Sequence, residues 1–177
     1  MKILKGILLI LTLIFTLIFI GSLFLPSKYH VERSIVINAP ADSIFQYANN
    51  LQNMNKWLPF KADYDTTFLI TYSSQVEGVG ASQKWDGKKL GSGSMKIIKS
   101  EPNKLVETEV TLGEGKVKSN GTFLLNETGG GVKITWQDEG SLGFNPVARI
   151  FGLFYDKLLG PDYETGLQNL KKICEKK

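Results

Sequence analysis

The sequence predicts an α+β protein in which an antiparallel sheet of about seven strands packs on a long C-terminal helix, preceded by one transmembrane helix. Three observations carry this prediction. The first 25 residues contain a long apolar run, and the middle of the chain alternates between short β-type runs and turns. After Asn145-Pro146 the apolar residues change to helical spacing. Strands followed in this order by a helix are typical of an α+β fold.

Residues 6–25 are 20 consecutive uncharged positions, mostly Leu, Ile and Phe. As a helix rising 1.5 Å per residue, this run extends about 30 Å, which matches the hydrocarbon core of a bilayer. The alternative is a cleaved signal peptide, but the run exceeds the roughly 7–15 apolar residues usual for such peptides, and no small-x-small cleavage site follows. We therefore predict a retained single-pass anchor over residues 1–26 and one domain over residues 27–177.

The charges that flank the apolar run favour one orientation in the membrane. Three positive groups precede the run (the α-amino group, Lys2 and Lys5), whereas two, Lys28 and Arg33, follow it closely. Because positive charge is enriched on the cytoplasmic side, we expect the N-terminus in the cytoplasm and the domain outside it.

Outside the first 25 residues the charge is nearly balanced, with 19 basic and 17 acidic residues. This balance argues against nucleic acid as a partner. The single cysteine, Cys174, excludes an internal disulfide and a cysteine-rich zinc site, and a single histidine argues against a histidine-based metal centre. We therefore predict no metal and no cofactor, and the composition leaves the oligomeric state open.

Alternating apolar residues predict the strands. A first strand is expected over residues 31–38, and a helix that starts after Asn38-Ala-Pro40 is interrupted at Asn49-Asn50. Six more strands are expected, separated by turns rich in glycine, proline and asparagine, such as Asp86-Gly87. Their predicted ranges are residues 68–74, 82–85, 91–100, 105–112, 116–126 and 132–140. Runs of this length joined by short turns are typical of an antiparallel meander.

The C-terminal helix is predicted to start at Asn145-Pro146, since proline is common in the first turn of a helix. Gly160-Pro161 is expected to kink or restart it. We expect its apolar stripe to face the sheet. The stripe consists of Val147, Ile150, Phe151, Phe154, Leu158, Leu167, Leu170 and Cys174.

The start of the predicted domain, Val31-Glu-Arg-Ser-Ile-Val-Ile-Asn-Ala-Pro40 followed by Ser43-Ile-Phe45, resembles the SRPBCC superfamily of START-like, helix-grip proteins. The resemblance is strongest to the polyketide cyclase/dehydrase-like branch and extends over residues 31–175. Further matching pieces are Gly78-Val-Gly-Ala81 with Trp85, Gly91-Ser-Gly-Ser-Met95, Val132-Lys-Ile-Thr-Trp136, Leu159-Gly-Pro-Asp162 and Gly166-Leu-Gln-Asn-Leu-Lys171. The resemblance implies a curved sheet with a ligand cavity between sheet and C-terminal helix, but no universal catalytic motif.

Aromatic side chains are the candidates for contact with a ligand in that implied cavity. Large amphipathic rings bind a hydrophobic molecule by shape, with few hydrogen bonds. The alternative for each ring is ordinary core packing or a place among exposed rings at the rim. The candidates are Trp57, Trp85, Trp136, Phe144, Phe151, Phe154 and Tyr155.

Two carboxylate pairs, Asp63 with Asp65 and Asp138 with Glu139, are candidates for acid–base chemistry, which requires burial to separate their pKa values. Both pairs are predicted at strand edges or loops, where a solvated acid is the default, so we assign no catalytic residue. His30 is expected in the linker between anchor and first strand, without a partner.

Three functions remain open from the sequence. The favoured one is a membrane-anchored domain that binds a hydrophobic small molecule or lipid, with residues 6–25 in the membrane. The second is an enzyme of the cyclase/dehydrase kind that the resemblance implies. The third is an interaction protein of the cell envelope that binds no ligand.

Overall fold

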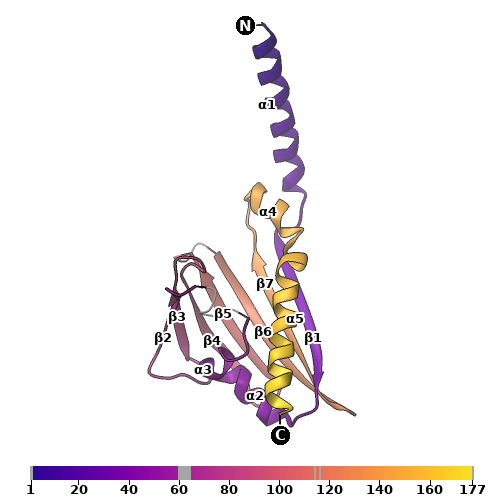
Figure 1. Cartoon of the computed structure of the whole chain (residues 1–177). Coiled ribbons are helices and arrows are strands. Elements are labelled where there is room, and N and C mark those ends of the chain that lie inside the picture. The colour runs from indigo at the N-terminus through magenta and orange to yellow at the C-terminus, as the bar shows by residue number, and fades with distance from the viewer. Residues whose placement is uncertain (1, 60–64, 114, 116, 177) are drawn as a thin grey trace.

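The structure is a computed structural model, and it describes residues 2–59, 65–113, 115 and 117–176 (Figure 1). In chain order the elements are α1 (Lys2–Leu23), β1 (Lys28–Ile37), α2 (Ala41–Asn49), α3 (Leu51–Met54), β2 (Leu69–Tyr72), β3 (Ser82–Asp86), β4 (Gly93–Glu101), β5 (Leu105–Leu112), β6 (Val117–Thr128), β7 (Gly131–Ser141), α4 (Pro146–Gly152) and α5 (Tyr155–Cys174).

The seven strands form one sheet in the order β1-β7-β6-β5-β4-β3-β2, and each neighbouring pair is antiparallel. The predicted α+β class and the meander from β2 to β7 are therefore confirmed. The last strand, β7, pairs with the first, β1, which forms one edge of the sheet. The helices α2 and α3 connect β1 to β2 at the opposite edge (Figure 1). α5 packs along β1 on the face of the sheet that we call the inner face.

The interruption predicted at Asn49-Asn50 is confirmed and has a local cause. The side chain of Asn50 accepts hydrogen bonds from the backbone N–H groups of Gln52 and Asn53, at 3.0 and 3.1 Å. These bonds satisfy two amide groups that the start of a helix leaves without partners. α3 therefore begins as a new helix, and it buries Leu51 and Met54 against the sheet.

The predicted C-terminal helix is corrected in two respects. It is broken at residues 153–154 into α4 and α5, whereas Pro161, where a kink or a restart was predicted, lies inside α5, so no new helix starts there. A proline within a helix removes one hydrogen bond. The helix continues because residues on both sides of Pro161 are buried against the sheet: Gly160 lies against the Arg33 side chain, and Tyr163 is 5% exposed.

The predicted stripe of this helix is also divided. Leu167 and Leu170 are buried in the core, as predicted, and Cys174 packs against it. Four other residues predicted on the same stripe are 48–58% exposed, so their assignment to a sheet-facing stripe is wrong: Val147, Phe151, Phe154 and Leu158. The break before α5 turns α4 away from the inner face, which helical spacing alone does not reveal.

α1 projects from the rest of the chain at the end where β1 begins (Figure 1). The segment Ile3–Leu23 is long and apolar enough to cross a membrane. The most apolar stretch of this segment is not buried against the rest of the chain. An N-terminal signal sequence can pass the same test of length and composition, so the helix by itself is compatible with either role.

Candidate functional site

An aromatic cluster packs the space between the sheet and α5. Trp136 of β7 stacks on Tyr163 of α5 with ring centroids 3.9 Å apart, and it also contacts Trp57 and Phe123 at 5.5 Å. We call these four residues the aromatic block. Gly166 allows α5 to approach this closely, because a Cβ atom there would meet the rings of Trp136 and Trp57 at 3.0 and 3.5 Å. This part of the sheet–helix interface is therefore filled by side chains.

A polar cluster lies beside the aromatic block, on the same face of β7. Asp138 is two residues beyond Trp136 and only 7% exposed. The Tyr29 hydroxyl donates a hydrogen bond to Asp138 Oδ1 at 2.7 Å, and the Ser119 hydroxyl donates one to Oδ2 at 3.2 Å. We call Tyr29, Ser119 and Asp138 the Asp138 cluster. None of the ion pairs formed between described residues includes Asp138.

Burial explains the protonation behaviour of this cluster. It raises the pKa of Asp138, because the charged carboxylate loses hydration, and the two hydroxyl donors oppose this only in part. The pKa of Tyr29 is also raised, first by burial and then by the negative charge of Asp138. The prediction of a solvated acid is therefore wrong for Asp138. A carboxyl group in this state can anchor a hydroxyl or carbonyl group of a ligand, or transfer a proton.

An apolar strip continues from the Asp138 cluster across the inner face. The strand register places Ser119 opposite Val110, Val110 opposite Met95, and Met95 opposite Gln83. Val110 and Met95 are partly exposed, as is Trp85 in the adjacent row. We call Val110, Met95 and Trp85 the inner-face strip. Directly paired residues lie on one face of a sheet, so the strip and the Asp138 cluster share one surface.

Glycines on this surface leave room for neighbouring side chains to lie close against the sheet. Gly121 lies beside Asp138, and a Cβ atom there would come within 2.7 Å of the Thr108 hydroxyl. Gly93 lies under the ring of Trp85, and Gly140 lies under the ring of Tyr29. A side chain at either glycine would displace the ring above it.

The seven aromatic candidates fall into three groups. Trp57 and Trp136 are buried in the aromatic block, and Trp85 belongs to the inner-face strip. Tyr155 is partly buried and packs edge-to-face on Tyr29, with centroids 4.8 Å apart. The other three are exposed, which agrees with the alternative of exposed rings at the rim. They are Phe144, Phe151 and Phe154, which are 86%, 56% and 48% exposed.

The other polar candidates have structural partners. Asp65 is 2% exposed and accepts hydrogen bonds from Thr67 and from the backbone N–H groups of Lys89 and Leu90, which lower its pKa. It joins two loops and is not the solvated acid that was predicted. Asp63 lies outside the described residues. His30 lies within β1 and contacts Glu139 Oε1 at 2.8 Å, so the prediction of a linker residue without a partner is wrong.

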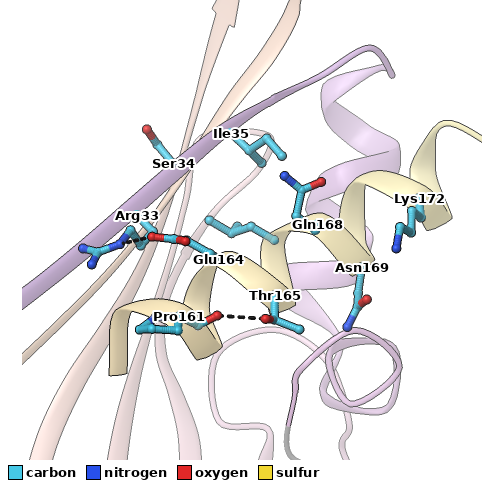
Figure 2. Close-up of a pocket in the computed structure, with 10 residues that line it drawn as sticks. Arg33, Ser34, Ile35, Pro161, Glu164, Thr165, Gln168, Asn169 and Lys172 are labelled. Atoms are coloured by element: carbon cyan, nitrogen blue, oxygen red, sulfur yellow. Dashed lines mark hydrogen bonds and ion pairs between the residues drawn. The ribbon is translucent and has the colours of Figure 1, made fainter. Parts of the chain in front are cut away.

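Two surface hollows on the described part of the chain lie outside the Asp138 cluster, and Trp85 of the inner-face strip lines the second of them. The first, of about 620 Å³, lies between β1 and α5 (Figure 2). Seven of its ten lining residues are polar or charged, and Arg33 there pairs with Glu164 at 2.7 Å, so it fits a polar ligand better than an apolar one. The second, of about 500 Å³, lies at the ends of β2 to β4 beside Trp85. Among the described residues, no group of three or more histidine, cysteine or acidic side chains is arranged to hold a metal ion.

Sequence reasoning missed Tyr29 and Ser119 as site residues. The available signal was alternation: Ile134, Trp136 and Asp138 are two residues apart, and a strand places such residues on one face. The burial of Asp138 follows once Trp136 is assigned to the core. The donors come from β1 and β6, and no local pattern connects those strands to β7.

Changing Asp138 to asparagine tests whether this carboxyl group is buried and has a raised pKa in the folded protein. Because its pKa is raised in the folded protein, the folded chain retains a proton that the unfolded chain loses at a pH of about 4. The free energy of unfolding attributable to Asp138 therefore falls as the pH rises from there through the folded pKa. We expect urea unfolding of wild type and Asp138→Asn to show a difference that changes with pH in this window. A pH-independent difference would contradict the burial of the carboxyl group.

A sheet that grips a long C-terminal helix, with short helices between its first and second strands, defines the helix-grip class of proteins. The sequence profile described as "Polyketide cyclase / dehydrase and lipid transport" matches residues 28–175. The chain belongs to this family, which confirms the resemblance and the fold class. No curated protein sequence matches the chain.

Solved structures agree with this assignment at the level of fold. A protein from Chromobacterium violaceum shares 14% identity, with a TM-score of 0.59 over 86% of this chain and 99% of that one. A protein from Mesorhizobium loti shares 18% identity, with a TM-score of 0.56 over 81% and 97%. The di-domain ARO/CYC protein StfQ of the steffimycin biosynthetic pathway shares 11% identity, with a TM-score of 0.61 over 84% of this chain and 51% of that one.

Proposed function

We propose that this chain is a membrane-anchored domain that binds a hydrophobic small molecule, lipid-like or aromatic, on the inner face of its sheet. In this proposal residues 1–26 are the anchor and residues 27–177 the binding domain, which lies outside the cytoplasm. The observation that carries the proposal is the Asp138 cluster beside the inner-face strip. It combines an apolar surface with one buried carboxyl group.

The chemistry of this surface favours a mostly apolar ligand with one polar group. Val110, Met95 and Trp85 offer apolar contact, whereas Asp138 and its hydroxyl donors offer one site for a hydrogen bond. Ligand pockets typically combine an apolar lining with a few placed polar groups. The family description, which names both cyclases and lipid transport, is compatible with such a ligand.

The membrane anchor supports a ligand that resides in the bilayer. Tethering holds the domain close to the membrane, which raises the effective concentration of the domain at its surface. The apolar length of α1 and the two lysines at the start of the chain are the basis for this part of the proposal.

Blocking the inner-face strip tests the binding proposal. Val110→Trp fills the strip, whereas Leu69→Trp adds the same side chain at a position that is 72% exposed on the edge strand β2. We expect native mass spectrometry after gentle extraction to detect a co-purifying small molecule with wild type and Leu69→Trp but not with Val110→Trp. A naphthoquinone probe should bind wild type at about micromolar affinity, near −8 kcal/mol, and quench tryptophan emission.

Equal retention in both variants would exclude the inner-face strip as the binding surface. If wild type binds neither a co-purifying molecule nor the probe, the binding proposal fails and the interaction protein becomes the leading hypothesis. Circular dichroism of Val110→Trp controls for loss of the fold.

The second candidate is an enzyme, and the raised pKa of Asp138 beside Tyr29 favours it. Such a carboxyl group can exchange a proton with a bound substrate. The two candidates differ for Asp138→Asn. In an enzyme this variant retains binding and loses turnover, whereas in a binding domain no turnover of the co-purified molecule is detected in either form.

A further inference from the structure

Exposed apolar side chains gather around α4. Six large apolar residues between positions 144 and 158 are 48–86% exposed, and we call them the α4 patch. They are Phe144, Val147, Phe151, Leu153, Phe154 and Leu158. Single exposed apolar residues are common, but a concentration within one short segment indicates an interaction surface.

A buried arginine holds α4 beside the end of α1. Arg149 is 6% exposed, and its Nη1 donates hydrogen bonds to the backbone oxygens of Leu23, at 2.6 Å, and Leu25, at 3.4 Å. Its Nε donates to the oxygen of Gly143 at 2.8 Å. The last carbonyl groups of a helix have no partners within the helix, so a cation there satisfies them and interacts favourably with the helix dipole.

The connection between α1 and the sheet is short. Only Phe24, Leu25, Pro26 and Ser27 separate α1 from β1, and four residues extend at most about 14 Å. Phe24 is itself 87% exposed. Figure 1 shows α4 at the junction of α1 with the sheet, so the α4 patch lies at the level where α1 ends.

We propose that the α4 patch is a membrane-binding surface that inserts into the leaflet from which α1 emerges. This inference rests on the proposed role of α1 as a membrane anchor. Interfacial helices bury an apolar face about 5–10 Å into the boundary between headgroups and acyl chains. The occupant is lipid because Arg149 hydrogen-bonds α4, the centre of the patch, to the end of the membrane-length helix.

With α1 and the α4 patch both in contact with the membrane, the orientation of the domain relative to the bilayer is fixed. A single contact through α1 would leave the domain free to rotate. The orientation places the proposed binding site near the bilayer. Phe154 of the patch is followed by Tyr155, which packs on Tyr29, and Tyr29 donates its hydrogen bond to Asp138. Tyr155, the residue after Phe154, therefore connects the α4 segment to the Asp138 cluster through its ring contact with Tyr29.

Fluorescent labels on the full chain in phosphatidylcholine vesicles test the inference. In a Cys174→Ser background, single variants Val147→Cys and Phe151→Cys carry an environment-sensitive NBD label on the patch. Val36→Cys is the control, because it is comparably exposed, at 41%, but lies near the opposite end of β1. We expect the patch labels to emit at shorter wavelength than the control label. Nitroxide lipids should quench the patch labels, and aqueous iodide should quench only the control label.

Two results would overturn the inference. Iodide quenching of the patch labels equal to that of the control label would place α4 in water. Protection of the patch labels from both quenchers would place α4 in a protein contact, such as a second copy of the chain. Carbonate washing of the same vesicles separates this inference from the anchor: retained protein with iodide-quenched labels refutes only the α4 contact, whereas released protein refutes the anchor.

Discussion

Replacing Trp136 with alanine is expected to lower the free energy of unfolding by about 3–5 kcal/mol. Trp136 is 5% exposed and contacts the three other members of the aromatic block, Tyr163, Trp57 and Phe123. Its removal leaves a cavity between β7 and α5, and neither element can collapse to fill it without moving the other. Urea unfolding of the full chain in mild detergent, followed by far-ultraviolet circular dichroism, measures the change.

The matched control for this prediction is an exposed apolar residue distant from the block. Leu69→Ala, at a position 72% exposed on β2, should change the free energy of unfolding by less than about 0.5 kcal/mol. A loss below about 1 kcal/mol for Trp136→Ala would mean that the block is not packed as described, since core truncations of this size cost more. Phe151→Ala should behave like the control and not like Trp136→Ala, because Phe151 is exposed.

Deleting residues 1–25 is expected to release the protein from the membrane completely. The wild-type chain should remain in the pellet after carbonate washing, at its full-length mass, because a 20-residue apolar run spans the bilayer. The shortened variant should appear in the supernatant. The α4 patch adds apolar area, but an interfacial contact is weaker than a spanning helix.

The mass of the wild-type protein distinguishes an anchor from a signal sequence. A soluble wild-type species lacking residues 1–25 would show that α1 is removed, and both the anchor and the α4 inference would then fail. Substituting Leu13 and Ile14 with lysine provides a second variant with unchanged length. Each charge at the centre of a span costs about 2.5–3.5 kcal/mol, so this variant should also leave the pellet.

Most of the fold could be predicted because its signals are local. The strand β5 occupies the predicted residues 105–112, and the other five strands after α3 lie within two residues of their predicted ends over the described range. Asn145 caps α4 through hydrogen bonds from Val147 and Ala148, in agreement with the predicted helix start. Alternation, turn residues and caps act over a few residues, so one sequence is sufficient to recognise them.

The candidate site could be predicted only in part. Trp136 and Trp57 were candidates for ligand contact, with core packing as the alternative, and the structure packs them against each other in the core. Asp138 was considered as a candidate for acid–base chemistry, but it was expected to be exposed to solvent. Its burial depends on Tyr29 and Ser119, which lie 109 and 19 residues away in the sequence. Sequence separation of this kind conceals the hydrogen-bond partners that make a buried carboxyl group tolerable.

The sequence by itself determined the order of the strands and the membrane-length helix, because periodicity and composition are carried by each segment independently. The family followed from the resemblance of its motifs to a known family. Only the tertiary structure decided which faces are covered. Phe151 and Leu167 follow the same helical spacing, yet Phe151 is exposed on α4 and Leu167, a residue of α5, is buried in the core. The difference arises because Arg149 ties α4 to the end of α1, whereas α5 packs along β1, and both contacts join residues more than 100 positions apart.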